Sequence, residues 1–418
     1  MNYDMLVKDI GQLILPESSL TPLKGEQMKG LSIKEQAAFA VSEGKVAWIG
    51  SNKEAGTLDA ELIISADNKV VSPGLVDSHT HLVFGGSREG ELELKQQGIP
   101  YLEILEKGGG ILSTVAATRQ STEEELVKKA AHHLETSIAH GITTLEAKSG
   151  YGLDKETELK QLRVLKILSR VYPITLVSTF LGPHAIPPEY KENVSAFIEE
   201  MISLLDVIKE EELAEFVDIF CETGVFSIEQ SRLFLEAAKE KGYGLKMHAD
   251  EIYSLGGTEL AVSLGAVSVD HLVAATDSGI EKLASSNTVA VLLPGTTFYL
   301  GKNTYAKARR IIDKGGAVAL ATDFNPGSSV TENLQVIMSL AALKLNMTAE
   351  EIWNAVTVNA AHAIGQSKEA GTLELGRKAD FVIWDIPTYQ YLPYHYGINH
   401  ADAVYVKGKK IWERARMI

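Results

Sequence analysis

The chain has 418 residues, of which 45% are hydrophobic and 23% are charged, so it is neither a disordered nor a fibrous protein. Its 40 basic and 55 acidic residues give a net charge of −15, which argues against nucleic acid and anionic membranes as partners. A single cysteine, a start without a secretory leader pattern, and the lack of any apolar run near the ~18 residues of a membrane span predict a cytoplasmic protein.

The two ends of the chain share one kind of pattern. Short strand-like segments, broken by proline, glycine and charged residues, occur at 5–7, 12–15, 38–41 and 45–49 and again at 380–384 and 403–406. Gly376 and Gly408 mark turns in the tail. We therefore predict a small β-sandwich domain assembled from residues 1–69 and 366–418.

Between residues 70 and 330, within a predicted domain of residues 70–365, short β-branched runs alternate with stretches of helical spacing. Eight such runs occur, at 70–84, 142–148, 174–180, 217–221, 245–248, 266–270, 289–293 and 318–322. Eight repeats of strand and helix predict a parallel sheet closed into a (β/α)₈ barrel, the TIM-like architecture of the α/β class.

The segment 85–120 is a long insertion after the first run and contains three successive glycines at 108–110. In a barrel, a connection from strand to helix lies on the catalytic face. We expect this segment to act as a lid, the alternative being a plain flexible connection.

Histidine spacing suggests a metal centre at the end of the first run. His79 and His81 are two positions apart, so on a strand both imidazoles point to the same side. Alone, such a pair is weak evidence and is often incidental. Further metal-capable residues end later runs, namely His184, His248, His271 and Asp323. In a barrel these strand ends meet at one mouth, so the group as a whole predicts metal binding.

Imidazole nitrogens with a carboxylate suit Zn²⁺, with iron as the alternative. Such an ion lowers the pKa of bound water to about 7, which makes hydrolysis the leading chemistry. Competing chemistries have little support in the sequence. Cys221 has no evident partner for nucleophilic catalysis, and neither a P-loop nor a strand followed by G-x-G-x-x-G occurs.

Several of these segments resemble the amidohydrolase superfamily over nearly the whole chain. They are PGLVDSHTH at 73–81, the histidines at 248 and 271, ATD at 321–323, and GTLELGRKADFV at 371–382. Many members with two metals carry a carboxylated lysine at the end of the fourth strand. The fourth run here ends IFCE at 219–222, without lysine, so the resemblance implies one metal ion per subunit. Lys148 belongs to the second run, and we do not expect it to be a bridging ligand.

Longer motifs resemble one branch of this superfamily, which acts in histidine degradation. They are FGGSR at 84–88, KSGYGL at 148–153, FLGPHA at 180–185, HADE at 248–251 and TDFNPGS at 322–328. The resemblance implies hydrolytic opening of 4-imidazolone-5-propanoate to N-formimidoyl-L-glutamate, by attack of water on the ring carbonyl. It also implies one Zn²⁺, or Fe²⁺/Fe³⁺, per subunit and a homodimer.

The same resemblance implies roles for single residues. The metal ligands are His79, His81, His248 and Asp323. Asp323 and His271 orient and deprotonate the water, and Glu251 handles a ring nitrogen of the substrate. Arg88 is the candidate partner of the propanoate, because a guanidinium binds a carboxylate with two hydrogen bonds. Further expected substrate contacts are Tyr101, Tyr151, His184, Asn325, Gly327 and Ser328.

Ordinary structural roles remain open for several of these residues. Tyr101 and Tyr151 are also explained by packing, His184 by a satisfied core position, and Arg88 and Glu251 by a solvated surface. Two other functions compete with the leading one. One is another mononuclear amidohydrolase, such as a deaminase of an aminated heterocycle, and the other is a metal-free barrel kept as a scaffold, against which the complete ligand set argues.

Overall fold

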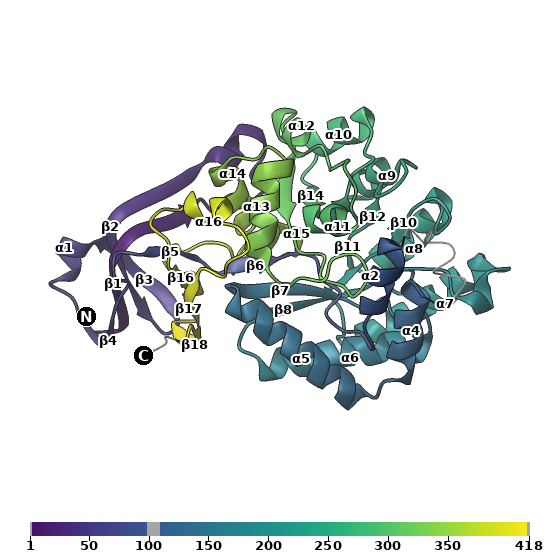
Figure 1. Cartoon of the computed structure of the whole chain (residues 1–418), viewed down its shortest axis with the longest axis horizontal. Helices are drawn as coiled ribbons and strands as arrows, with labels where there is room; N and C mark the ends of the chain where they lie inside the picture. Colours follow the sequence, from purple (N-terminus) through teal and green to yellow (C-terminus); the bar gives the residue numbers. More distant parts are fainter. Residues whose placement is uncertain (1, 98–108, 416–418) are drawn as a thin grey trace.

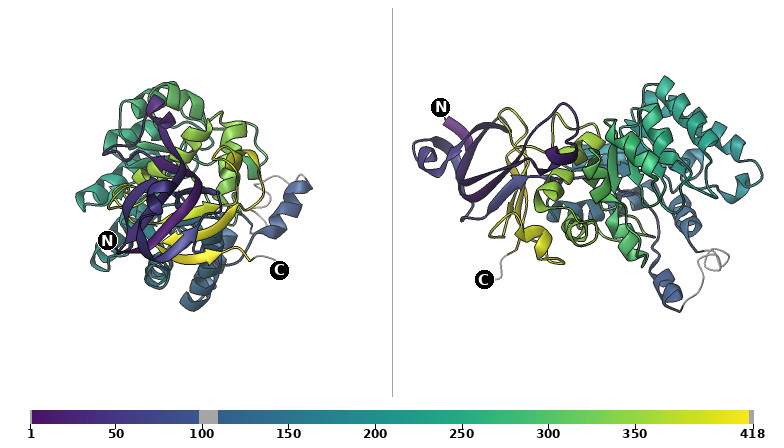
Figure 2. Two further views of the ribbon diagram at one scale, coloured as in Figure 1. Left: turned by 90° about the vertical axis from the view of Figure 1, so that its left-hand side faces the viewer. Right: turned by 90° about the horizontal axis from the view of Figure 1, so that it is seen from above.

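The computed structural model describes residues 2–97 and 109–415. Two regions are visible in Figure 1, a β-rich part that contains both chain ends and a larger barrel surrounded by helices. Viewed along the long axis of the molecule, the β-rich part lies in front of the barrel (Figure 2). Within the described ranges, no helix has the length and apolar character needed to cross a membrane.

The barrel is made of parallel strands in eight successive positions, and each overlaps one of the eight runs predicted from the sequence. The strands are β6 (Leu75–Asp77), β7 (Ile142–Lys148), β8 (Thr175–Phe180), β9 (Phe216–Val217) with β10 (Phe220–Cys221), β11 (Gly244–Leu245) with β12 (His248–Ala249), β13 (Ser268–His271), β14 (Val289–Leu292) and β15 (Ala317–Leu320). The fourth and fifth positions each consist of two short strands. The first of each pair belongs to the sheet β11-β9-β8-β7-β6 and the second to the sheet β10-β12-β13-β14-β15, so these two positions connect the sheets. The predicted TIM-like barrel is therefore confirmed.

The barrel closes between its first and last strands. A parallel bridge joins Thr80 to Phe324 just beyond the ends of β6 and β15. Nearby, Thr322 donates to Asp77 from its backbone N–H, 3.1 Å from Oδ1, and from its hydroxyl, 2.6 Å from Oδ2. Closure therefore places the residues after β6 beside those after β15.

Helices follow the barrel strands, and most of them pack on the outside of the barrel. They are α2 (Glu89–Gln96), α4 (Ile111–Gln120), α5 (Glu123–Ala139), α6 (Lys155–Val171), α7 (Val194–Glu210), α8 (Ile228–Glu240), α9 (Gly257–Leu264), α10 (Asp277–Ala284), α11 (Pro294–Tyr299), α12 (Ala308–Asp313), α13 (Leu334–Lys344), α14 (Ala349–Ala355) and α15 (Val358–Ala363). Side-chain caps begin several of them, as where Asp154 accepts from the backbone N–H of Thr157 in α6. Leu162 and Leu165 of α6 are fully buried, which shows how such a helix seals the sheet.

One hydrogen-bonded sheet unites the two chain ends, which confirms the predicted β-rich domain. Its order is β18-β17-β16-β5-β1-β2-β3, with β4 paired to β1. The strands are β1 (Asn2–Pro16), β2 (Leu31–Ser42), β3 (Lys45–Ser51), β4 (Asp59–Ser65), β5 (Val70–Pro73), β16 (Phe381–Trp384), β17 (Ala401–Val406) and β18 (Lys409–Glu413). Phe39 from the first part packs edge-on against Phe381 from the second, with ring centroids 5.1 Å apart. The two ends thus share one apolar core.

The chain passes from this sheet into the barrel at Gly74. The run 70–84 therefore divides, since β5 pairs with β1 and β16 while β6 pairs with β7. A Cβ atom at Gly74 would lie 2.0 Å from Oγ1 of Thr143, so the passage requires glycine. The domain limits 1–69, 70–365 and 366–418 stay a prediction.

A buried tryptophan fastens the terminal sheet to the base of the barrel. Trp384, the last residue of β16, donates from its indole N–H to the hydroxyl of Ser72 over 2.8 Å. Its ring lies edge-on to Trp353, with centroids 6.1 Å apart, and a Cβ atom at Gly141 would come within 2.5 Å of it. The sheet and the barrel are therefore packed against each other.

Candidate metal centre and substrate pocket

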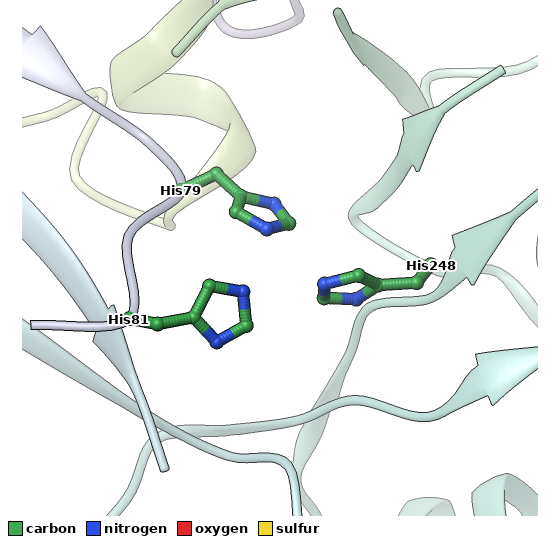
Figure 3. Close-up of side chains that lie close together, drawn as sticks. All are labelled: His79, His81 and His248. Atoms are coloured by element: carbon green, nitrogen blue, oxygen red, sulfur yellow. The ribbon is translucent and has the colours of Figure 1, made fainter. Parts of the chain in front are cut away.

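Three histidines converge at the mouth of the barrel. His79 and His81 follow β6, His248 begins β12, and all three are buried. Figure 3 shows their imidazoles turned toward one another from the two sides of the barrel. Their candidate ligand atoms lie within 4.8 Å of one another, as expected for a metal centre. Strand ends therefore bring together residues that are far apart in the sequence.

Asp323 lies beside this histidine cluster, just beyond β15. Its Oδ1 is 3.5 Å from Nε2 of both His79 and His81, which is too long for a strong hydrogen bond. Its Oδ2 accepts from the hydroxyl of Thr296 over 2.5 Å. The backbone of Asp323 has φ 52°, an unusual conformation for a residue other than glycine, and it turns this side chain into the mouth.

Two further carboxylates hold the histidines from behind. Asp270 contacts Nδ1 of His79 at 2.6 Å, and Asp218 contacts Nδ1 of His248 at 3.0 Å. A carboxylate accepts, so these contacts place a proton on each Nδ1 and leave Nε2 as the atom able to bind a metal. This carboxylate–histidine arrangement is typical of metal sites.

Unpaired nitrogens make the cluster fit a metal ion. Among the described residues, Nε2 of His79, Nε2 of His248 and Nδ1 of His81 are buried without a hydrogen-bond partner. Buried polar atoms are nearly always paired, so such a group calls for a ligand. Three imidazoles and one carboxylate are a donor set that suits zinc or iron.

Burial and neighbouring charges set the pKa values of these groups in the metal-free protein. Burial and Lys148 lower the pKa of His79, but Asp270 and Asp323 raise it more, to about 9. Burial lowers the pKa of His248 to about 3, although Asp218 acts in the opposite direction. A metal ion at His79 therefore competes with a proton.

His271 and Glu251, the two other predicted catalytic residues, lie next to each other. His271 ends β13 and is buried, and its Nδ1 is 3.8 Å from Oε2 of Glu251 on the loop after β12. His271 also belongs to a group with His79 and Asp323 whose ligand atoms lie within 4.8 Å of one another. The structure therefore brings both residues to the edge of the histidine cluster.

His184 and Tyr151 form one wall above the cluster. The His184 ring stacks on that of His81 at 4.9 Å with 9° between the planes, and Tyr151 lies 5.7 Å from His81. Nδ1 of His184 bonds the carbonyl of Gly150 at 2.9 Å, so this nitrogen carries the proton and Nε2 is an acceptor. Burial, together with His81 and His248, holds the pKa of His184 well below its usual value, which keeps the ring neutral.

The loop after β15 is held together by Asn325. Its Oδ1 accepts from the backbone N–H groups of Gly327 and Ser328, each over 2.8 Å, and its Nδ2 donates to the carbonyl of Asp323 over 2.6 Å. The side-chain amide of Asn325, which was expected to bind the ligand, therefore holds the backbone of its own loop. Its direct contact with substrate stays a prediction, as do those of Gly327 and Ser328.

Arg88 reaches this loop from the segment after β6. A Cβ atom at Gly327 would lie 2.0 Å from Nη1 of Arg88, so the absence of a side chain makes room for the guanidinium. Nε and Nη2 of Arg88 donate hydrogen bonds to the carboxylate of Glu91 over 3.0 and 2.8 Å. Glu91 also accepts from the backbone N–H of Gly110 over 2.6 Å, and so joins both ends of the insertion. Tyr101, the remaining predicted contact, lies outside the described residues.

Comparison with known proteins agrees with this geometry. The profile of the amidohydrolase family matches residues 70–411. The chain belongs to the amidohydrolase family. It is 58% identical to an imidazolonepropionase of Bacillus cytotoxicus and 57% identical to one of Bacillus cereus, in each case over 99% of both chains. The curated relatives therefore match this amidohydrolase from end to end.

Solved structures share the fold of this amidohydrolase at low sequence identity. A 5-methylcytosine deaminase from Klebsiella pneumoniae aligns with a TM-score of 0.75 at 17% identity over 99% of both chains. A zinc-bound adenosine deaminase from Xanthomonas campestris aligns with a TM-score of 0.72 at 16% identity, over 98% of this chain and 93% of the other. At these identities the likeness bears on the architecture alone.

The residues behind the amidohydrolase site were not identified from the sequence. Asp218 and Asp270 lie in or beside predicted strands, where the sequence offers no sign that they contact histidines. Glu91 follows Arg88 by three residues, a helical spacing that could have indicated the pair. Glu158 is another such residue, since it accepts from the backbone N–H groups of Gly150, Gly152 and Leu153 and so holds the loop of Tyr151.

Proposed function

We propose that this amidohydrolase is an imidazolonepropionase, which hydrolyses the ring amide of 4-imidazolone-5-propanoate to give N-formimidoyl-L-glutamate. The full-length identity of 58% to a curated imidazolonepropionase carries the proposal. The converging histidines, with an arginine at the same mouth, supply the chemistry that this reaction needs. A cyclic C–N bond is broken by water, and the substrate carries an anionic tail.

We propose that His79, His81, His248 and Asp323 hold one metal ion, either zinc or iron. When bound, such an ion acts as a Lewis acid that makes water a nucleophile near neutral pH. Asp270 and Asp218 would keep the rings of His79 and His248 oriented throughout the reaction, because each is already hydrogen-bonded to Nδ1. The ligand set thus needs little rearrangement.

Asp323 and Glu251 would divide the proton transfers. Burial raises the pKa of the Asp323 carboxyl, but His79 and His81 lower it more, so it is held well below its usual value and is ionised and able to accept a proton from the attacking water. The water oxygen bonds to the ring carbonyl carbon, and collapse of the tetrahedral adduct breaks the ring C–N bond. The proton taken by Asp323 would pass through His271 and Glu251, which lie next to each other, to the departing ring nitrogen, so that the carboxylates end the turnover as they began it.

His184 and Arg88 would position the substrate. Since Nδ1 of His184 donates to Gly150, its Nε2 is available to accept an N–H of the imidazolone ring, whereas it is not suited to stabilise an oxyanion. Arg88 would bind the propanoate with its Nη groups, next to Gly327. Tyr151 would lie against the ring as a wall of the pocket.

Turnover of freshly prepared 4-imidazolone-5-propanoate tests the function. Metal-replete protein and protein stripped by a chelator are assayed in parallel for formiminoglutamate, and metal is added back to the stripped sample. We expect product with the replete protein, none with the stripped protein, and recovery on addition of Zn²⁺ or Fe²⁺. If a sample of verified metal content forms no product, the substrate is another cyclic amide or an aminated heterocycle.

We also propose that the enzyme acts in the cytoplasm as a homodimer. The single cysteine, buried at position 221, supports a reducing compartment. Light scattering coupled to gel filtration distinguishes a dimer from the 45.4 kDa monomer.

A further inference from the structure

Lys148 is buried behind the proposed metal centre among acidic side chains. It ends β7 and is 0% exposed, and its Nζ lies 2.7 Å from Glu146, 2.9 Å from Asp218 and 3.7 Å from Asp270. The three carboxylates are equally buried. Because a buried charge is costly unless it is paired, these four side chains form one unit.

Two of these carboxylates are those that hold histidines. The Oδ2 atom of Asp218 that contacts Lys148 also accepts a hydrogen bond from Nδ1 of His248. In the same way, the Oδ2 atom of Asp270 that faces Lys148 accepts one from Nδ1 of His79. One ammonium therefore links two carboxylates whose histidines come from opposite sides of the barrel.

The third carboxylate leads to the segment between His79 and His81. Oε2 of Glu146 accepts from the backbone N–H of Thr80 over 3.4 Å, and the hydroxyl of Thr80 donates to the carbonyl of Glu146 over 2.8 Å. The backbone N–H of Lys148 itself donates to the carbonyl of Thr80 over 2.9 Å. Each acidic partner of Lys148 is therefore hydrogen-bonded either to a proposed histidine ligand or to Thr80, the residue between two of them.

A second buried lysine offers a matched comparison. Lys246 is also 0% exposed, but its Nζ donates to the carbonyl of Ala363 over 2.9 Å, and its nearest carboxylate, on Glu146, is 4.0 Å away. Burial lowers the pKa of Lys246, whereas the carboxylates around Lys148 outweigh burial and raise its pKa. The two lysines share their burial, and the charge of Lys246 also lowers the pKa of Asp270. They differ in distance, since only Lys148 lies within 3 Å of Glu146 and Asp218.

Lys148 also occupies a second candidate cation position behind the site. Asp218, His248 and Asp270 form a group whose ligand atoms lie within 4.8 Å of one another, but the Lys148 ammonium contacts both carboxylates of this group. An ammonium has no lone pair, so Lys148 is not a metal ligand. Its positive charge instead stabilises the ionised carboxylates of Asp218 and Asp270 in their present positions.

We propose that Lys148 is a positioning residue of the metal centre, whose ammonium fixes Asp218, Asp270 and Glu146 so that the imidazoles of His79, His81 and His248 converge. This inference rests on the metal centre proposed above. It does not depend on the substrate. Loss of the ammonium would leave three buried carboxylates without the cation that they share, although each keeps its other hydrogen bonds, and the histidines would be held less firmly.

The test compares Lys148→Met with Lys246→Met in zinc binding. The affinity of each purified protein for Zn²⁺ is measured by competition with a chromophoric chelator, and folding is checked by circular dichroism and thermal unfolding. We expect Lys148→Met to bind Zn²⁺ about 10- to 100-fold more weakly than wild type, the usual cost of losing support behind a ligand. Lys246→Met should weaken Zn²⁺ binding less than Lys148→Met does, because Lys246 acts on Glu146 and Asp270 through its charge and makes no close contact with Asp218 or Asp270.

The outcomes separate this inference from the proposed function. If wild type binds no Zn²⁺, the metal centre itself is wrong. If wild type binds and folded Lys148→Met binds equally tightly, or if Lys246→Met weakens binding as much, the role of Lys148 is refuted.

A measurement on the wild type covers the case in which Lys148→Met does not fold. Nitrogen NMR of zinc-loaded, histidine-labelled protein should show the protons of His79 and His248 on Nδ1, protected from exchange. Lys148→Gln provides a second, polar variant in which the same signals should weaken. Unprotected Nδ1 protons in the wild type would overturn the inference.

Discussion

The inner and outer parts of the site are held in place in different ways. The inner part consists of buried strand-end residues such as His79, His248 and Asp323, and its two histidines are held by carboxylates from other strands. The outer part consists of loop residues such as Arg88 and Ser328, which are positioned by contacts between loops. Strand ends are fixed by barrel closure, whereas loops depend on individual anchors. The inner part therefore suits chemistry, and the outer part suits selection among substrates.

The largest effect is expected at Asp323. Asp323→Asn removes both a proposed metal ligand and the proposed base, so kcat should fall roughly 10²- to 10⁴-fold or more, with weaker metal binding. Assay of formiminoglutamate together with metal analysis checks this, with the exposed Asp206→Asn as the control. Near-normal turnover would show that Asp323 is neither the base nor an essential metal ligand.

A smaller loss is expected at Glu251, which lies where the two parts meet. Glu251→Gln keeps the shape of the side chain but removes its proton-handling group, so kcat should fall about 10²-fold while the metal content is unchanged. Metal analysis on the same sample separates the two effects. Loss of metal would instead assign Glu251 to the inner part.

An outer residue should affect binding more than chemistry. Arg88→Lys keeps the charge but loses the two-pronged contact with a carboxylate, so KM should rise about 10-fold with little change in kcat. Steady-state kinetics with 4-imidazolone-5-propanoate measure this, and Arg232→Lys on the exposed face of α8 is the control. Unchanged KM would remove Arg88 from the substrate site.

The smallest effect is expected at Gly327. Gly327→Ala places a methyl group against Nη1 of Arg88, and the flexible guanidinium can move away, so we expect KM to rise severalfold and the metal affinity to stay as in wild type. Gly90→Ala is the control, because a Cβ atom at Gly90 would meet nothing within 4 Å and the backbone there is not in the left-handed region. An equal effect of both variants would mean that contact with Arg88 is unimportant.

The contrast also explains how far the sequence alone could be interpreted. The barrel strands were predictable because short β-branched runs recur with regular helices between them, and the convergence of His79 with His248 follows from barrel topology. The supporting residues were not predictable in this way. Asp270 and Lys148 contact across strands, and a linear pattern does not report which strand faces which.

Loop geometry was the least predictable part of the site. Asn325 was expected to bind the ligand, yet the amide bonds its own loop, which is the usual local competition between an asparagine side chain and the backbone. The Arg88–Glu91 pair has an i, i+3 spacing, but nothing in the sequence shows that Gly110 closes the same contact. Contacts of this kind depend on the three-dimensional path of the loops.

The pairing of β5 with both β1 and β16 has a consequence for the order of assembly during synthesis. Every residue of the proposed metal centre, from His79 to Asp323, leaves the ribosome before Phe381, the first residue of β16. The barrel can thus collapse and acquire its ion while the sheet beside it still lacks β16, β17 and β18. Until β16, β17 and β18 have emerged and paired, the nascent chain would carry a finished catalytic mouth on a terminal sheet that is still incomplete.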